Sequence, residues 1–281
     1  MSAFLALLSS LCWGSADFLG GLATRRLPSI VVVWISQIFG LVLISAIVLA
    51  TGSWHAPPQY WPWALLASVS GAVGLISFYR ALATGSMGVV APIAGLGGLI
   101  PLAAGLASGE GFSQLAAVGA IAILAGVIFA SGPELNAEGG RRPLLLAVAA
   151  AVLFGISLLA IARGSAHTTL MTIAGMRIFS VSIIGFGLLL ARKAVVAPRP
   201  EVRRLLPLMA AGGVLDVSAN LTYGASSTTG LLVVVAVLGS LYPVVTAVLA
   251  AIVLHERLRR IQYAGVALAV VGLALLSVGQ S

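Results

Sequence analysis

Charged residues are the scarcest class in this sequence. Only 8% of its 281 residues are Asp, Glu, Lys or Arg, while 60% are hydrophobic and the mean hydropathy is +1.14. A soluble domain carries about 25% charged residues, so this composition excludes an ordinary water-soluble fold. The chain is suited to a lipid bilayer, and membrane lipid is the first partner that we expect.

Cysteine is nearly absent as well. The single Cys12 lies in the first apolar run and supports neither a disulfide framework nor a multi-thiolate metal site. His55, His167 and His255 lie in loops, far apart in the sequence and without metal-ligand spacing. We therefore expect no metal site and no cofactor, and we interpret these histidines as surface residues.

Sequence signatures of enzymes and of nucleic-acid-binding proteins are also missing. HExxH, GxxxxGK[ST], CxxC and GxSxG do not occur, and no pair of carboxylates is placed with a histidine. The net charge of +8 comes from short basic segments between apolar runs, without an aromatic and basic groove. We predict no enzymatic activity, no nucleic-acid partner and no use of ATP.

What the sequence does contain is a series of apolar runs, each near the 20 or so residues that cross a membrane as a helix. We therefore predict an all-α membrane protein with ten transmembrane helices. The first run lacks a basic leader and contains Asp17, so we expect it to be retained rather than cleaved as a signal peptide. The runs cover residues 3–23, 29–50, 62–83, 87–107, 112–131, 143–162, 168–190, 205–225, 229–250 and 260–278.

Lys and Arg gather in the connections that follow the odd-numbered runs, around residues 25–26, 141–142, 192–204 and 257–260. The other connections hold almost nothing basic apart from Arg163. Because short cytoplasmic loops carry the excess of Lys and Arg, we predict that the basic side is cytoplasmic and that both termini lie outside.

The sequence also repeats itself. Residues 109–126, "GEGFSQLAAVGAIAILAG", align without a gap with residues 255–272, "HERLRRIQYAGVALAVVG". The offset drifts between 140 and 146 earlier in each half, where Trp13-Gly14 faces Phe154-Gly155. The identical pairs are Glu110 with Glu256, Gly119 with Gly265 and Gly126 with Gly272, each 146 positions apart.

This pattern predicts a duplicated five-helix unit, with a first repeat at 1–133, a linker at 134–142 and a second repeat at 143–281. An odd number of spans inserts the second copy upside down relative to the first. Inverted repeats of this kind build many secondary transporters around one central site. The architecture therefore points to transport.

Four segments carry a more specific resemblance: "CWGSADF" at 12–18, "YRAL" at 79–82, "SLYPVVTAVLAAIVLHERL" at 240–258 and "QYAGVALAVVG" at 262–272. In these segments the sequence resembles EamA-type transporters of the drug/metabolite transporter (DMT) superfamily. The resemblance covers nearly the whole chain. It implies a ten-helix carrier of the bacterial inner (cytoplasmic) membrane that moves small metabolites, often amino acids, outward. It also implies a site lined mainly by the third, fourth, eighth and ninth helices.

Polar side chains inside the predicted spans are the candidate substrate-binding residues, because a charge near the bilayer centre costs about 2.5–3.5 kcal/mol on insertion scales. Arg177 and Asp216 both fall near mid-depth and can pair. Asn220 lies one helical turn beyond Asp216, and Gln37 occupies the position equivalent to Arg177. The pair either locks two helices together, or it holds the ammonium and carboxylate ends of a zwitterion or gates its release.

Asp17 and Arg80 lie toward the cytoplasmic ends of the first and third runs. They are candidates for gating or ion coupling, although Arg80 can also snorkel to the interface. If transport is coupled to protons, Asp216 or Asp17 is the expected carrier. Glu110 and Glu256 stand at helix starts, where the helix dipole favours a carboxylate, so we interpret them as caps.

Proline, glycine and aromatic residues complete the candidate site. "VVAPIAGLGGLIPLAAG" at 89–105 contains Pro92 and Pro101 and predicts a broken or closely packed fourth helix. "VLGSLYPVVT" at 237–246 offers Ser240 and Tyr242 beside Pro243. Aromatic faces that can cover an apolar or cationic substrate, or mark the membrane interface, are those of Trp13, Tyr79 and Tyr223.

Three functions remain open. The first is an exporter of small polar metabolites such as amino acids, and the second is a proton-coupled exporter of lipophilic cations or drugs. The third is a membrane enzyme or a non-transporting subunit, which would have a sealed interior. An Arg177 that is reachable from the cavity favours the first, whereas an unpaired carboxylate beside aromatic rings favours the second. The expected partners are a small-molecule substrate, protons and lipid, in a monomer or weak dimer.

Overall fold

The computed structural model describes residues 1–84, 87–111, 113–130, 141–190, 195, 197–253 and 260–279. Within these ranges every regular element is an α-helix or a short 3₁₀ helix, as the composition predicts. The linker predicted at 134–142 falls largely outside the described residues, and so do His255, Glu256 and Arg257. The proposed domain boundaries therefore stay a prediction.

Helical segments lie in each of the ten predicted runs, and in the fourth and ninth runs they are interrupted. In the first half the helices are α1 (Ser2–Thr24), α2 (Ser29–Thr51), α3 (Trp61–Thr84), α4 (Met87–Gly95), α5 (Leu99–Ala107) and α6 (Gln114–Ala130). In the second half they are α7 (Arg141–Ser165), α8 (Thr169–Leu190), α9 (Arg199–Thr229), α10 (Leu232–Gly239), α11 (Tyr242–Val253) and α12 (Arg260–Val278).

Seven helices of the described chain are long and apolar enough to cross a membrane. Three apolar helices are shorter, at Ile93–Ala107, Gln114–Phe129 and Arg260–Leu276. At 1.5 Å per residue, a helix of about 17 residues spans roughly 25 Å, somewhat less than a hydrocarbon core of about 30 Å. The chain is thus a multi-pass helical membrane protein, and the full count of ten crossings stays a prediction.

The interruptions of the fourth and ninth runs have local causes. A 3₁₀ turn, Leu96–Gly98, separates α4 from α5, and a Cβ atom on Gly97 would lie 2.6 Å from the carbonyl oxygen of Ala151. The break therefore falls at the glycines, between Pro92 and Pro101. In the ninth run α10 ends at Gly239 and α11 begins at Tyr242, just before Pro243, whose missing N–H suits a first helical turn.

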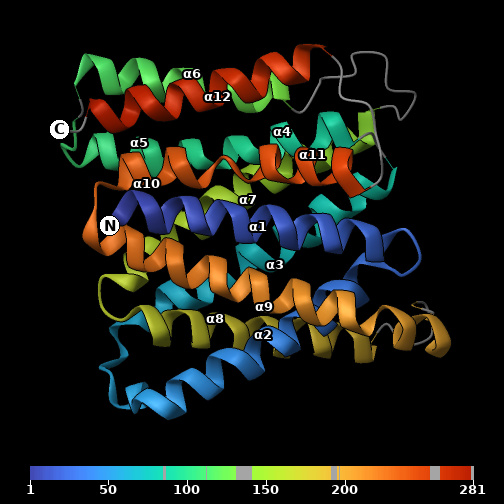
Figure 1. The fold of residues 1–281 in the computed structure, drawn as a ribbon. Helices are drawn as coiled ribbons and strands as arrows, with labels where there is room; N and C mark the ends of the chain where they lie inside the picture. Colours follow the sequence, from blue (N-terminus) through green and yellow to red (C-terminus); the bar gives the residue numbers. More distant parts are fainter. Residues whose placement is uncertain are drawn as a thin grey trace.

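Helices that hold equivalent places in the two halves lie side by side. In Figure 1, α6 and α12 form one edge of the molecule and α2 and α8 form the opposite edge, while α4–α5 and α10–α11 lie nearer the first pair. Two of the other large contacts are also equivalent to each other with the halves exchanged, since α1 packs on α9 and α3 packs on α7. The packing thus follows the duplication that the sequence predicts.

Glycines bring the backbones of α6 and α12 into close contact. A Cβ atom on Gly119 would lie 2.7 Å from the carbonyl oxygen of Gly272, and one on Gly126 would lie 2.8 Å from that of Gly265. These glycines belong to the pairs that align at an offset of 146 residues, and the second contact is the first with the halves exchanged. As the position in α6 advances, the partner in α12 moves backward, so the equivalent helices are antiparallel.

The two ends of the helices differ in charge. The N-terminus and the end of α12 lie on the same side of the molecule, while the connection from α1 to α2 lies on the other (Figure 1). At that other end Arg26 Nη1 lies 3.7 Å from Glu201 Oε2, which joins the end of α1 to the start of α9. The arginines near this end include Arg25, Arg26, Arg199, Arg203 and Arg204.

Many large apolar side chains lie on the surface and many small side chains lie in the interior, as is typical of a membrane protein. Large apolar side chains such as Ile121, Phe186 and Leu189 are exposed, whereas the buried positions hold many Ala, Gly and Ser residues. Small residues let helix backbones approach closely in lipid, where the apolar faces need not be hidden. The exposed apolar surface therefore fits contact with acyl chains.

Candidate functional site

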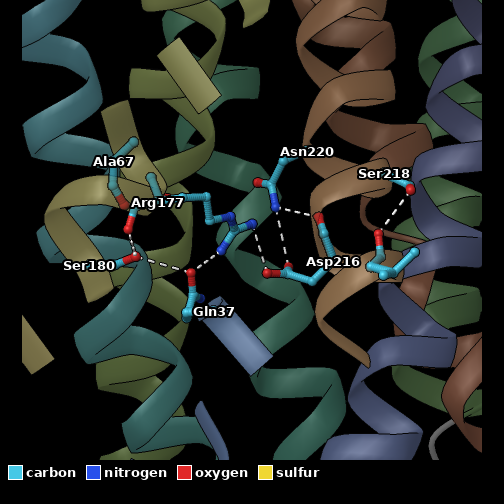
Figure 2. A network of polar contacts seen from close by, with 9 residues as sticks. Gln37, Ala67, Arg177, Ser180, Asp216, Ser218 and Asn220 are labelled. Carbon is cyan, nitrogen blue, oxygen red and sulfur yellow. Dashed lines mark hydrogen bonds and ion pairs between the residues drawn. The ribbon is translucent and has the colours of Figure 1, made fainter. Parts of the chain in front are cut away.

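A buried ion pair joins α8 to α9 near the middle of both helices. Arg177 is only 1% exposed, and its Nη2 lies 2.7 Å from Asp216 Oδ2, as Figure 2 shows. The pairing predicted from the sequence is therefore present. A guanidinium in a low-dielectric interior needs a countercharge, because the desolvation of an unpaired ion costs several kcal/mol.

Gln37 extends this pair to α2. Its Oε1 accepts hydrogen bonds from Arg177 Nη1 and, at 3.0 Å, from Ser180 Oγ. A second contact, from Trp34 Nε1 to the carbonyl oxygen of Val181 at 3.0 Å, shows that α2 and α8 cross in opposite directions. Gln37 and Arg177, equivalent positions of the two halves, thus meet each other at the crossing.

Asn220 completes the network from α9 itself. Its Nδ2 donates to the backbone oxygen of Asp216 at 2.5 Å and to Asp216 Oδ1 at 3.2 Å. The four-residue spacing places both side chains on one helical face. Four residues singled out from the sequence therefore form one network. Among the described residues, Arg177 Nε has no hydrogen-bond partner.

A cavity of about 70 Å³ adjoins this network. It exceeds the roughly 10–15 Å³ that one water requires, and it is lined by helices of both halves. Seven of the predicted site residues line it: Trp13, Asp17, Gln37, Arg177, Asp216, Asn220 and Tyr242. The other lining residues are Gly71, Leu75, Phe154, Ser157, Leu158, Ile161 and Met176.

Asp17 reaches this cavity from α1 together with Trp13, four residues earlier. Asp17 is 7% exposed, and no described residue makes a hydrogen bond or an ion pair with its carboxylate. The Trp13 ring lies edge to face with that of Tyr242 of α11, at 6.4 Å between centroids. Gly14 permits this approach, because a Cβ atom there would lie 2.6 Å from the backbone oxygen of Tyr242. The backbone oxygen of Gly14 also accepts a 3.0 Å hydrogen bond from Thr246 Oγ1 of α11.

Four predicted site residues are absent from the described lining of the cavity. Tyr79 is buried with its hydroxyl against Gly20, and Tyr223 is buried beside Trp13 at 5.4 Å between ring centroids. Ser240 Oγ donates to the backbone oxygen of Val237 at 2.7 Å. Arg80 is exposed on α3. The structure thus places these four outside the group that meets at the cavity.

The lining also contains residues that the sequence interpretation missed. Phe154 faces Trp13 in the alignment of the two halves, so the repeat itself could have identified it. Leu75, Leu158 and Ile161 carry no comparable signal, because apolar residues fill every span. The α4–α5 segment, which the resemblance placed in the site, contributes no residue to the described lining.

Glu110 caps a helix other than the expected one. It precedes α6, yet its Oε2 accepts a 3.0 Å hydrogen bond from the backbone N–H of Val233, in the first turn of α10. The first N–H groups of a helix lack intrahelical partners and favour a negative charge. The carboxylate of the first half thus stabilises a helix of the second half.

Comparison with known proteins agrees with this architecture. The model of the "EamA-like transporter family" matches residues 1–132 and 141–278, once in each half. A solved crystal structure, titled only as that of a protein, is 18% identical, with a TM-score of 0.78 over 99% of this chain and 97% of the other. No curated protein matches the chain. Because the family model covers both halves, the chain belongs to the EamA-like transporter family.

Proposed function

We propose that the protein is a secondary transporter that exports small polar metabolites such as amino acids across the bacterial cytoplasmic membrane. The observation that carries this proposal is the cavity, which is lined from both halves beside the polar network of Gln37, Arg177, Asp216 and Asn220. Ionisable residues at membrane depth mark substrate or ion pathways. A site shared by two repeats is the usual arrangement in secondary transporters.

In this proposal the halves are inverted five-helix repeats and the chain crosses the membrane ten times. The antiparallel contact of α6 with α12 and the placement of both termini at one end support it. The arginines near the opposite end favour a cytoplasmic location for that end. Both termini then lie outside, and the protein works as a monomer or weak dimer.

Transport by alternating access requires the cavity to open and enlarge. At about 70 Å³ it is smaller than the roughly 300–1,000 Å³ of drug-sized ligand sites. The ion pair between Arg177 and Asp216 holds α8 against α9 and is the contact that rearranges when the substrate enters. Asp216 and Asp17 both line the cavity, so either carboxyl can exchange a proton with it if transport is coupled to a pH gradient.

A second substrate class is supported by a specific observation. Asp17 has no ion-pair partner in the described chain and lies beside Trp13 and Tyr242. An unpaired carboxylate next to aromatic faces suits a lipophilic cation or drug exported in exchange for protons.

The experiment starts with purified protein and a thermal-shift screen against amino acids, nucleosides, sugars and quaternary cations. Each hit is then tested by counterflow in proteoliposomes. We expect Asp216→Asn to abolish pH-driven transport while the protein remains folded. The matched control is Glu201→Gln, which removes a carboxylate in the first turn of α9 that does not line the cavity. If transport by Asp216→Asn still depended fully on the pH gradient, Asp216 would not be the proton-coupling residue.

A further inference from the structure

We infer that the cavity binds the positively charged nitrogen of its substrate at Asp17, and that Arg177 does not serve as an anion site. This inference rests on the proposed transport function and selects, of the two substrate classes proposed above, the one whose members are cations, here small amines and organic cations. Of the charged residues that line the cavity, it assigns recognition to Asp17 and a structural role to Arg177.

The charge balance of the cavity is the first support. Three charged side chains line it, namely Asp17, Arg177 and Asp216. Arg177 and Asp216 neutralise each other at 2.7 Å, which leaves the carboxylate of Asp17 without a countercharge in the described chain. An uncompensated buried charge is costly, so the Asp17 carboxyl is ionised only when it has a countercharge, which a bound cation would provide.

The environment of Arg177 is the second support. One terminal nitrogen binds Gln37 and the other binds Asp216, and the side chain is almost fully buried. A substrate carboxylate prefers the paired terminal nitrogens of a guanidinium, which form two parallel hydrogen bonds. Nε has no partner among the described residues, but every pair of neighbouring nitrogens that could form such a fork includes one that already binds Gln37 or Asp216. A substrate carboxylate would therefore have to displace one of these partners.

The aromatic side chains around Asp17 are the third support. Trp13 and Tyr242 both line the cavity, and their rings are 6.4 Å apart between centroids. A cation near an aromatic face gains about 0.5–2 kcal/mol from the ring quadrupole, and more when it is desolvated. The buried Tyr242 hydroxyl has no hydrogen-bond partner in the described chain, so it can accept a bond from an ammonium N–H.

Isothermal titration of the full-length protein in detergent tests the inference with matched small probes. The probes are n-propylammonium, propionate and 1-propanol, which share size and differ in charge, together with tetramethylammonium. We expect the protein to bind both cations and to bind propionate and 1-propanol at least tenfold more weakly. Equal binding of propionate and n-propylammonium, or no binding of either cation, would overturn the inference.

Variants identify the residues responsible. Asp17→Asn is expected to weaken binding of both cations at least tenfold, whereas Asp17→Glu and the control Glu201→Gln retain the preference for cations. Tyr242→Phe is expected to weaken n-propylammonium more than tetramethylammonium, because only the first has N–H groups to donate. If Asp17→Asn fails to fold, the comparison of n-propylammonium with propionate in the unmodified protein still decides whether the cavity prefers a cation. An unchanged affinity for n-propylammonium in a folded Asp17→Asn would contradict the inference.

Failure of this inference is distinguishable from failure of the transport function. Counterflow of an amino acid or another anion-bearing substrate that persists in Asp17→Asn would leave the transporter intact and move recognition away from Asp17. If folded and reconstituted protein showed no counterflow with any substrate class, the proposed transport function itself would be contradicted.

Discussion

Substitution of Gly119 by alanine tests the packing that relates the two halves. The added Cβ would lie 2.5 Å from the backbone nitrogen of Leu276 and 2.7 Å from the carbonyl oxygen of Gly272. Both neighbours are backbone atoms of α12, so the helices must separate. Overpacking of this kind costs about 1–3 kcal/mol, and we expect Gly119→Ala to lower the stability of the protein by an amount in that range.

Gly187→Ala is the matched control. Gly187 lies in α8, and no described atom comes within 4 Å of the Cβ that it would gain. Because alanine is better than glycine in a helix by about 0.5–1 kcal/mol, this variant is expected to be neutral or slightly more stable. The same chemical change thus has opposite expected effects at the two sites.

Equilibrium unfolding in mixed dodecylmaltoside and SDS micelles, followed by far-ultraviolet circular dichroism, measures both variants. We expect the free energy of unfolding of Gly119→Ala to fall below that of Gly187→Ala by about 1–3 kcal/mol. Adding Gly272→Ala to Gly119→Ala should cost less than the sum of the two single changes, because they share one contact. Equal stability of Gly119→Ala and Gly187→Ala would refute the close antiparallel contact.

Three further predictions concern the ion pair, the inter-half cap and the orientation. Asp216→Leu should destabilise the protein by about 3–5 kcal/mol, because it leaves a buried guanidinium without a countercharge. Arg177→Met should cost less, since the remaining Asp216 side chain is 22% exposed. The double variant should recover most of the lost stability in the same unfolding assay. Glu110→Gln should lower stability by about 1 kcal/mol through the weakened cap on α10, whereas an unchanged value would show that this hydrogen bond contributes nothing. In a Cys12→Ala background, Ala56→Cys should react with an impermeant maleimide on intact cells and Arg26→Cys only after lysis; the reverse pattern would place the termini inside.

The polar residues of the site could be predicted from the sequence, because few polar or charged side chains are tolerated near the centre of a membrane. A charged side chain within the membrane requires a partner, so the few charged residues predicted at mid-depth were expected to pair with one another. Arg177 and Asp216 were identified on that ground, Gln37 as the repeat equivalent of Arg177 and Asn220 by its helical spacing from Asp216. The structure brings all four together. The duplication identified the glycines of α6 and α12 in the same way, since both members of each pair were visible.

The apolar part of the site could not be predicted, because hydrophobicity does not distinguish a residue at the cavity from one at lipid. Leu75 and Leu158 line the cavity, while Leu145 and Leu189 are exposed, and nothing in composition separates them. Hydroxyl groups were equally ambiguous, since the hydroxyl of Ser240 donates its hydrogen bond to the backbone oxygen of Val237 and not to a ligand site. The cap of Glu110 on α10 depends on tertiary packing, which spacing along the chain does not encode.

Access to the cavity from both sides of the membrane tests the central claim most directly. In the Cys12→Ala background, Ser157→Cys would place a single thiol at the cavity wall, where Ser157 now donates to the backbone oxygen of Ala67. Impermeant methanethiosulfonate reagents, one cationic and one anionic, are applied to each side of oriented proteoliposomes. Reaction from both sides, faster with the cationic reagent, is the expected result. Reaction from one side only, or from neither, would contradict alternating access through a cavity shared by the two halves.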